Sequence, residues 1–249
     1  MATLKNFIKV LRREIILNST VWIYTIVSFL SLTLLAFIIS IASHSGQSED
    51  FFSFWYNVGL IMGNIFVSIS AFRDLRLRGF DVIYISMPVS TFQKWFSVWL
   101  LTFVGYFLVF TAAFYLFLLI IVGVSAVFGL HIGMPQIFTP NVLEQIKNIY
   151  PLINALFLLG AIVFKRYVFL LTASISIGII IIINLFFVLF AWIYLKITLG
   201  GITPLIKDIS SLAIGFSDFE FSNNPMKNYI LDFILWTASF FKLKEKQLK

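Results

Sequence analysis

Long, uninterrupted apolar stretches alternate with short polar segments along the chain. Stretches such as residues 21–42 and 167–195 exceed the ~20 helical residues that cross a hydrocarbon core. They are continuously apolar instead of alternating with a period of two, so they predict helices and not barrel strands. The pattern predicts six membrane-crossing helices, at about residues 21–42, 54–72, 95–130, 148–164, 167–195 and 229–241.

Residues 1–18 predict an amphipathic helix that lies on the membrane surface. Its apolar face comprises Leu4, Phe7, Ile8, Leu11 and Ile15. Its basic face comprises Lys5, Lys9, Arg12 and Arg13. A solvated helix with a chance apolar stripe is the alternative. The apolar stretch that follows is longer than the ~7–15 residues of a signal-peptide core, which favours a retained span.

The third stretch, residues 95–130, decides the topology because it could hold one long helix or two short ones. Its middle, Phe110-Thr111-Ala112-Ala113, has no Gly, Pro or Asn to form a turn at lipid depth. One helix places 14 of the 18 basic residues on the cytoplasmic side and 4 outside, whereas two helices give 12 and 6. We therefore expect six spans with both ends in the cytoplasm. The sixth, residues 229–241, is short and could begin upstream or enter the membrane only partway.

The composition supports an all-α integral membrane protein with a single transmembrane domain over residues 1–249. Hydrophobic residues make up 60% and charged residues 12%, against roughly 25% charged in soluble domains. The net charge of +7 is typical of cytoplasmic anchoring, so we expect the lipid bilayer and not nucleic acid as the partner. The absence of cysteine excludes disulfides, thiolate metal sites and lipidated cysteine anchors.

The sequence contains no recognisable catalytic, cofactor or metal motif. His44 and His131 belong to no ligand-spaced set, and neither a GxxxxGK[ST] loop nor a GxSxG elbow occurs. Asp232 is the only ionisable residue inside a predicted span; an interfacial position is favoured over an ion-coupling site because it lies near the span's outer end. Otherwise the spans hold Asn64, Asn154, hydroxyl groups and aromatic side chains, together with Asn184. We expect no enzyme activity in this chain.

Gly59 and Gly63 form a GxxxG pattern in the second predicted span. Small residues at this spacing let helices approach closely. Packing within the chain is the favoured interpretation, and a dimer seam is the alternative.

The loop between the second and third spans is the candidate site for docking a cytoplasmic partner. Pro88 ends any preceding helix, and Ser90 with Gln93 three residues later predicts a capping box for the next one. The candidate docking residues are Arg73, Asp74, Arg76, Arg78, Asp81, Pro88, Ser90, Gln93 and Lys94. The residues alone leave two interpretations open, namely anchoring of the span by its basic cluster and docking of a protein.

At this loop the sequence resembles the ABC-2 type permease subunits of ABC exporters. The resemblance lies in the surface helix, in Phe72-Arg73-Asp74-Leu75, and in the PxSxxxK passage from Pro88 to Lys94. Phe157-Leu158-Leu159-Gly160 with Phe164-Lys165-Arg166 is similar to uncharacterised permease-like proteins of Bacteroidetes.

This resemblance implies a homo- or heterodimer in the bacterial cytoplasmic (inner) membrane that works with a separate ATP-binding cassette subunit. That partner would bind ATP and Mg²⁺ and would contact the loop through a short coupling helix. The expected function is export of a lipid-like or amphipathic peptide substrate. A non-transporting membrane scaffold or accessory subunit is the alternative.

Overall fold

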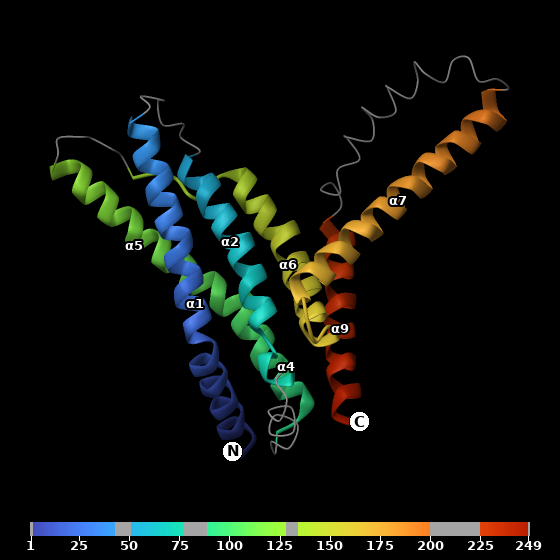
Figure 1. Cartoon of the computed structure of the whole chain (residues 1–249), viewed down its shortest axis with the longest axis horizontal. Helices are drawn as coiled ribbons and strands as arrows, with labels where there is room; N and C mark the ends of the chain where they lie inside the picture. The colour runs from blue at the N-terminus through green and yellow to red at the C-terminus, as the bar shows by residue number, and fades with distance from the viewer. Residues whose placement is uncertain (1, 43–50, 77–88, 128–133, 200–224, 249) are drawn as a thin grey trace.

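The computed structural model describes residues 2–42, 51–76, 89–127, 134–199 and 225–248, and no strand occurs in these ranges (Figure 1). Its elements are α1 (Ala2–Ala42), α2 (Phe51–Ser70), the 3₁₀ turn η1 (Arg73–Leu75), α4 (Thr91–Trp99), the π-helical segment η2 (Leu100–Gly105), α5 (Tyr106–Val127), α6 (Pro140–Val163), α7 (Val168–Leu199) and α9 (Pro225–Leu248). Successive long helices alternate in direction, and both ends of the chain lie on one side of the bundle (Figure 1).

Five helical segments of the described chain are long and apolar enough to cross a membrane. They are Phe7–Ile41, Phe51–Ser70, Thr91–Val127, Pro140–Val163 and Val168–Tyr194. The predicted sixth span lies in α9, which is long enough at 24 residues but is not among the five. Its sequence explains this, because α9 contains Asp232 and ends in a run of lysines.

The first helix differs from the prediction, because no break separates the surface helix at residues 1–18 from the first span. α1 is one helix of 41 residues, about 60 Å long. The polar residues at the expected junction bond to their own helix. The Asn18 side-chain amide donates to the Glu14 carbonyl (3.1 Å), and the Ser19 hydroxyl donates to the Ile16 carbonyl (2.8 Å). They therefore leave the helix uninterrupted.

The third apolar stretch forms one continuous helical segment from Thr91 to Val127, as the lack of turn residues predicted. The π-helical segment η2 lies between α4 and α5. Such a segment widens the helix locally and is often found at functional sites. It was not predicted, because its sequence, Leu-Leu-Thr-Phe-Val-Gly, looks like an ordinary part of an apolar helix.

Two helices begin earlier than the hydrophobic pattern indicated. α6 begins at Pro140 and not near residue 148, because the Thr139 side chain caps it by accepting from the Val142 amide and proline suits a first helical position. α9 begins at Pro225 and not at residue 229. The first eight residues of α6, residues 140–147, include several polar side chains, and the apolar pattern alone therefore assigned them to a loop.

The core is aromatic and lies between α1, α2, α5 and α6. Tyr56, Tyr106, Phe110 and Phe114 are fully buried there. The two tyrosine hydroxyls are satisfied inside the bundle: Tyr106 donates to the Gly59 carbonyl (2.9 Å), and Tyr56 bonds to the Thr111 hydroxyl (2.8 Å). By contrast, α7 packs near its N-terminal end on α6 and then diverges from the bundle (Figure 1).

Candidate functional site

The predicted docking segment, residues 73–94, is described at its two ends. Arg78, Asp81 and Pro88 lie outside the described residues, and Asp74 lies within η1. Arg73 is exposed. Arg76 is half-buried, and its guanidinium donates to the Ile69 carbonyl at the end of α2. Burial, reinforced by the neighbouring charge of Arg73, lowers the pKa of Arg76 from its usual value.

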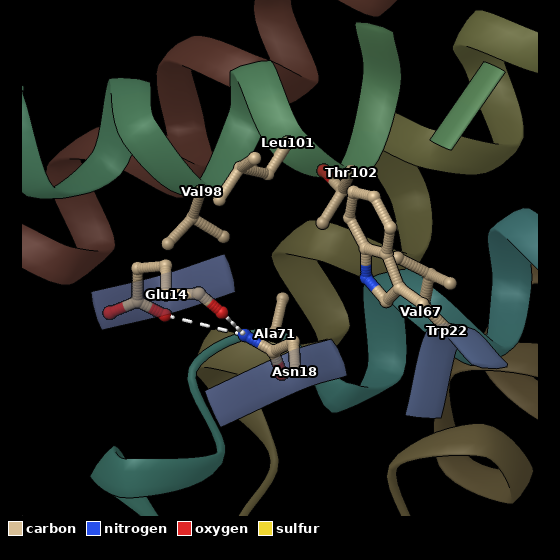
Figure 2. A pocket seen from close by; sticks show the side chains of 8 residues that line it. All are labelled: Glu14, Asn18, Trp22, Val67, Ala71, Val98, Leu101 and Thr102. Atoms are coloured by element: carbon tan, nitrogen blue, oxygen red, sulfur yellow. Dashed lines mark hydrogen bonds between the residues drawn. The ribbon is translucent and has the colours of Figure 1, made fainter. Parts of the chain in front are cut away.

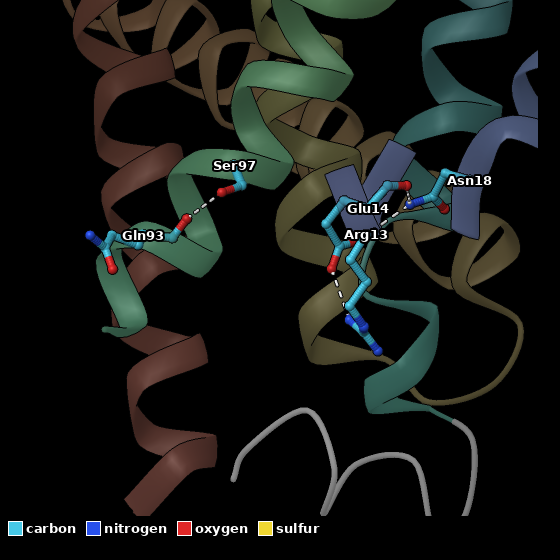
Figure 3. A network of polar contacts seen from close by, with 5 residues as sticks. All are labelled: Arg13, Glu14, Asn18, Gln93 and Ser97. Atoms are coloured by element: carbon cyan, nitrogen blue, oxygen red, sulfur yellow. Dashed lines mark hydrogen bonds and ion pairs between the residues drawn. The ribbon is translucent and has the colours of Figure 1, made fainter. Parts of the chain in front are cut away.

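At the other end of the segment, α4 begins as the capping box predicted. The Ser90 hydroxyl accepts a hydrogen bond from the Gln93 amide (3.2 Å), which confirms Ser90 as the N-cap. The Gln93 carbonyl in turn accepts from the Ser97 hydroxyl (2.6 Å; Figure 3). Ser90 is exposed, but Lys94 is only 1% exposed. Lys94 therefore offers a partner no exposed charge, because its side chain is packed inside the bundle.

On α1, a polar group lies beside this end of α4 (Figure 3). Arg13 and Glu14 form an ion pair at 3.2 Å, and Glu14 also bonds to the Asn18 side chain (3.4 Å). Glu14 is 5% exposed. α1 is thus packed against the bundle at Val10 and Glu14.

A buried apolar cluster, which we call the loop-root cluster, connects the start of the docking segment to three helices. Its members are Ala71, Phe72, Leu75, Val98, Leu158, Ile162 and Leu243. Trp95, Trp99 and Trp236 pack against it. Phe72 adopts a left-handed backbone conformation (φ 56°), which turns the chain sharply after α2 and brings Leu75 back into the cluster. Displacing Leu75 would therefore disturb α4, α6 and α9 together.

Beside these tryptophans lies a buried polar cluster centred on Asn154 of α6, which we call the Asn154 cluster. The Asn154 amide nitrogen lies 3.1 Å from Asn64 Oδ1, 3.1 Å from the Ser68 hydroxyl and 3.3 Å from the Thr102 hydroxyl. Trp236 Nε1 donates to Asn154 Oδ1 at 3.3 Å. The cluster links α2, η2, α6 and α9 at one point inside the apolar bundle.

Aromatic rings surround the Asn154 cluster on the side of the π-helical segment. Trp236 packs edge-on against Trp99 (centroids 5.4 Å apart) and Phe103 (5.3 Å). The Tyr150 hydroxyl donates to the Phe103 carbonyl within η2 (2.5 Å). Trp99 Nε1 is buried with no hydrogen-bond partner among the described residues. The π-helical segment therefore lies beside a buried polar level of the bundle interior.

A small cavity lies between α1, α2 and the segment from α4 to η2 (Figure 2). It is lined by Glu14, Asn18, Trp22, Val67, Ala71, Val98, Leu101 and Thr102. Its volume of about 10 Å³ is that of roughly one water molecule. In this conformation the cavity has no room for a transported lipid or peptide.

Asp232 on α9 is buried against the other helices of the bundle. It is 1% exposed, and neither carboxylate oxygen has a hydrogen-bond partner among the described residues. Trp236 bonds to Asn154 and Lys246 to the Ile162 carbonyl, so α9 and α6 are parallel. Asp232 thus lies one turn before the Asn154 cluster, on the α9 face that Trp236 and Ser239 share.

Replacing this carboxylate should stabilise the bundle. We expect Asp232→Leu to raise the free energy of unfolding by about 1–3 kcal/mol, because a buried acidic group without a partner is replaced by a side chain suited to the apolar contact. Unfolding by SDS in mixed micelles measures this. Glu144→Leu, at an exposed acidic position on α6, is the matched control and should change little. A loss of stability in Asp232→Leu would contradict the description of Asp232 as unpaired.

The glycines of the GxxxG pattern face α5 of the same chain, and Gly63 also lies close to Thr25 of α1. A Cβ atom on Gly59 would lie 2.5 Å from Phe110 Cζ, and one on Gly63 would lie 1.7 Å from the Tyr106 hydroxyl oxygen. Gly160 of α6 makes the same kind of approach to Thr172 of α7 (2.0 Å to Oγ1). These glycines allow the rings and the neighbouring helix to touch the backbone directly.

No group of three His, Cys, Asp or Glu side chains within the described ranges could hold a metal ion, and His44 and His131 lie outside those ranges.

No protein-family model, curated protein or solved structure matches the chain. The helices nevertheless indicate its class, which is that of multi-pass, all-helical membrane proteins.

Proposed function

We propose that the chain is the membrane-spanning subunit of an ATP-driven exporter that works as a dimer with a separate cytoplasmic ATPase. The partner would dock on residues 73–94 and supply the energy, since the sequence has no nucleotide-binding loop. The substrate we propose is lipid-like or an amphipathic peptide, which an interior of aromatic and hydroxyl side chains would suit.

One observation supports this proposal most strongly, and it is the packing of the loop root. Leu75 belongs to the docking segment, between Arg73 and Arg76. It is buried in the loop-root cluster with side chains of α4, α6 and α9. A displacement of the docking segment would therefore shift side chains of three helices directly. Trp236 contacts both the loop-root cluster and Asn154, so the same displacement would strain the Asn154 cluster.

The basic side chains support docking at the same end. Exposed cations lie at Arg73, at Lys165 and Arg166 in the turn between α6 and α7, and at Lys244 near the end of α9. Steering of a partner by such charges is strongest at low salt.

The test is affinity purification of the full chain from its native membrane. We expect a nucleotide-hydrolysing partner to be recovered, with an ATPase rate that rises when this subunit is present. The paired charge reversal Arg73→Glu and Arg78→Glu should lower that stimulation by about tenfold, because charges at an interface edge set association.

Lys147→Glu is the matched control, because it reverses an exposed cation near the start of α6, outside residues 73–94 and away from the end of α6 that the loop root contacts. It should leave the stimulation intact. Recovery of no ATPase, or an ATPase indifferent to the paired reversal, would leave the scaffold hypothesis as the better one.

A further inference from the structure

Four cations from separate parts of the chain converge at the loop-root cluster. Leu75, Ile162 and Leu243 pack together in that cluster. Arg76 directly follows Leu75, Lys242 directly precedes Leu243, and Lys165 lies three residues after Ile162. The fourth cation is Lys246, whose ammonium group donates to the Ile162 carbonyl at the end of α6. We call Arg76, Lys165, Lys242 and Lys246 the four-cation cluster.

Three of these four charges have no ion-pair partner among the described residues. Lys242 pairs with Glu245 (2.7 Å), but Arg76, Lys165 and Lys246 form no ion pair with any described residue. Arg76 and Lys246 donate instead to main-chain carbonyls. Burial lowers the pKa of Lys246, and the nearby charges of Lys165, Lys242 and Arg76 lower it further. An anion placed among the four would relieve this repulsion.

Exposed aromatic side chains beside the cluster indicate where it sits relative to the bilayer. Tyr167 is 74% exposed and Phe241 is 58% exposed, and they adjoin Arg166 and Lys242 in the sequence. Aromatic side chains bordering cations are typical of the membrane interface, at the depth of lipid head groups. The turn between Val163 and Val168 is also too short to leave that interface.

We propose that the four-cation cluster binds the phosphate group of an anionic phospholipid head group. Lysine and arginine between helices are suited to such head groups, since each contributes a charge-assisted contact to the phosphate oxygens. The bound lipid would fix the end of α9 against the end of α6 and the loop root. The proposal does not depend on an ATPase partner.

The test uses the purified full chain in nanodiscs of phosphatidylcholine, with and without phosphatidylglycerol. Native mass spectrometry of the released protein measures the lipid retained. We expect phosphatidylglycerol to be retained in preference to phosphatidylcholine, and Lys165→Gln and Lys246→Gln each to lower that preference by about fivefold. Thermal unfolding of the variants in phosphatidylcholine alone verifies that they remain folded.

Lys244→Gln is the matched control, since it removes an exposed lysine from the same helix and outside the four-cation cluster. It should keep the preference. An equal loss in Lys244→Gln would show attraction by general surface charge and overturn the site. Inorganic phosphate could also raise the thermal unfolding temperature of the protein in phosphatidylcholine nanodiscs. A rise equal to that given by phosphatidylglycerol would overturn the lipid as the ligand of the four-cation cluster.

Discussion

Replacing Asn154 with leucine is expected to lower the free energy of unfolding by about 2–4 kcal/mol. The change removes the hydrogen bonds that Asn154 makes to Asn64, Ser68, Thr102 and Trp236, each of which contributes on the order of 0.6–1 kcal/mol in a membrane helix bundle. It also leaves the indole N–H of Trp236 without a partner in an apolar interior, and an unsatisfied donor adds to the cost.

Asn184→Leu provides the matched control for this prediction. This variant carries the same substitution in another apolar helix, α7. The Asn184 side chain is exposed, and it donates only to the Ile180 carbonyl of its own helix (2.7 Å). Unfolding by SDS in mixed micelles should show a shift for Asn154→Leu and almost none for Asn184→Leu. Equal shifts in the two variants would mean that the Asn154 cluster contributes nothing specific.

Gly63→Ala is expected to destabilise the bundle by about 3 kcal/mol, at the upper end of the usual overpacking cost. The new methyl group would lie 1.7 Å from the Tyr106 hydroxyl oxygen and 2.6 Å from Cζ. The ring has no free space to move into, because Tyr106 is fully buried and its hydroxyl is bonded to the Gly59 carbonyl. Relief of the clash would require α2 and the start of α5 to separate.

Gly123→Ala on α5 is the control, since no atom lies within 4 Å of a Cβ placed there. It should be neutral or slightly stabilising, because alanine favours the helix over glycine. Tyr106→Phe in the Gly63→Ala background removes the closest atom and should restore part of the lost stability. A Gly63→Ala variant that unfolds like the wild-type chain would contradict this packing of α2.

The sequence predicted the elements whose signal is local. Uninterrupted apolar length indicated the helices, the lack of turn residues near Phe110 indicated one long third segment, and Ser90 indicated the start of α4. The continuity of α1 was not predicted, because its amphipathic first turns matched a surface helix as well as they match the end of a long one.

The candidate sites depended more on long-range packing. Asn64 and Asn154 were visible as the polar residues of two apolar stretches, but nothing local indicates that they bond to each other across 90 positions. Lys94 was predicted to be a docking residue at the end of the loop, but its side chain is packed inside the bundle. Asp232 was predicted to lie at the membrane interface, and nothing local indicates that its side chain is buried inside the bundle, on the α9 face that Trp236 and Ser239 share.

The attachment of α7 has a mechanical consequence. Its packing on α6 lies in the first turns, where Phe169 stacks on Phe157 and Thr172 meets Gly160. The remaining length acts as a lever about the four-residue turn before Val168. With 32 residues, or about 48 Å, a rotation of about 10° at that pivot displaces the far end by about 8 Å. Small rearrangements near Lys165 are therefore amplified into large displacements at the far end of α7.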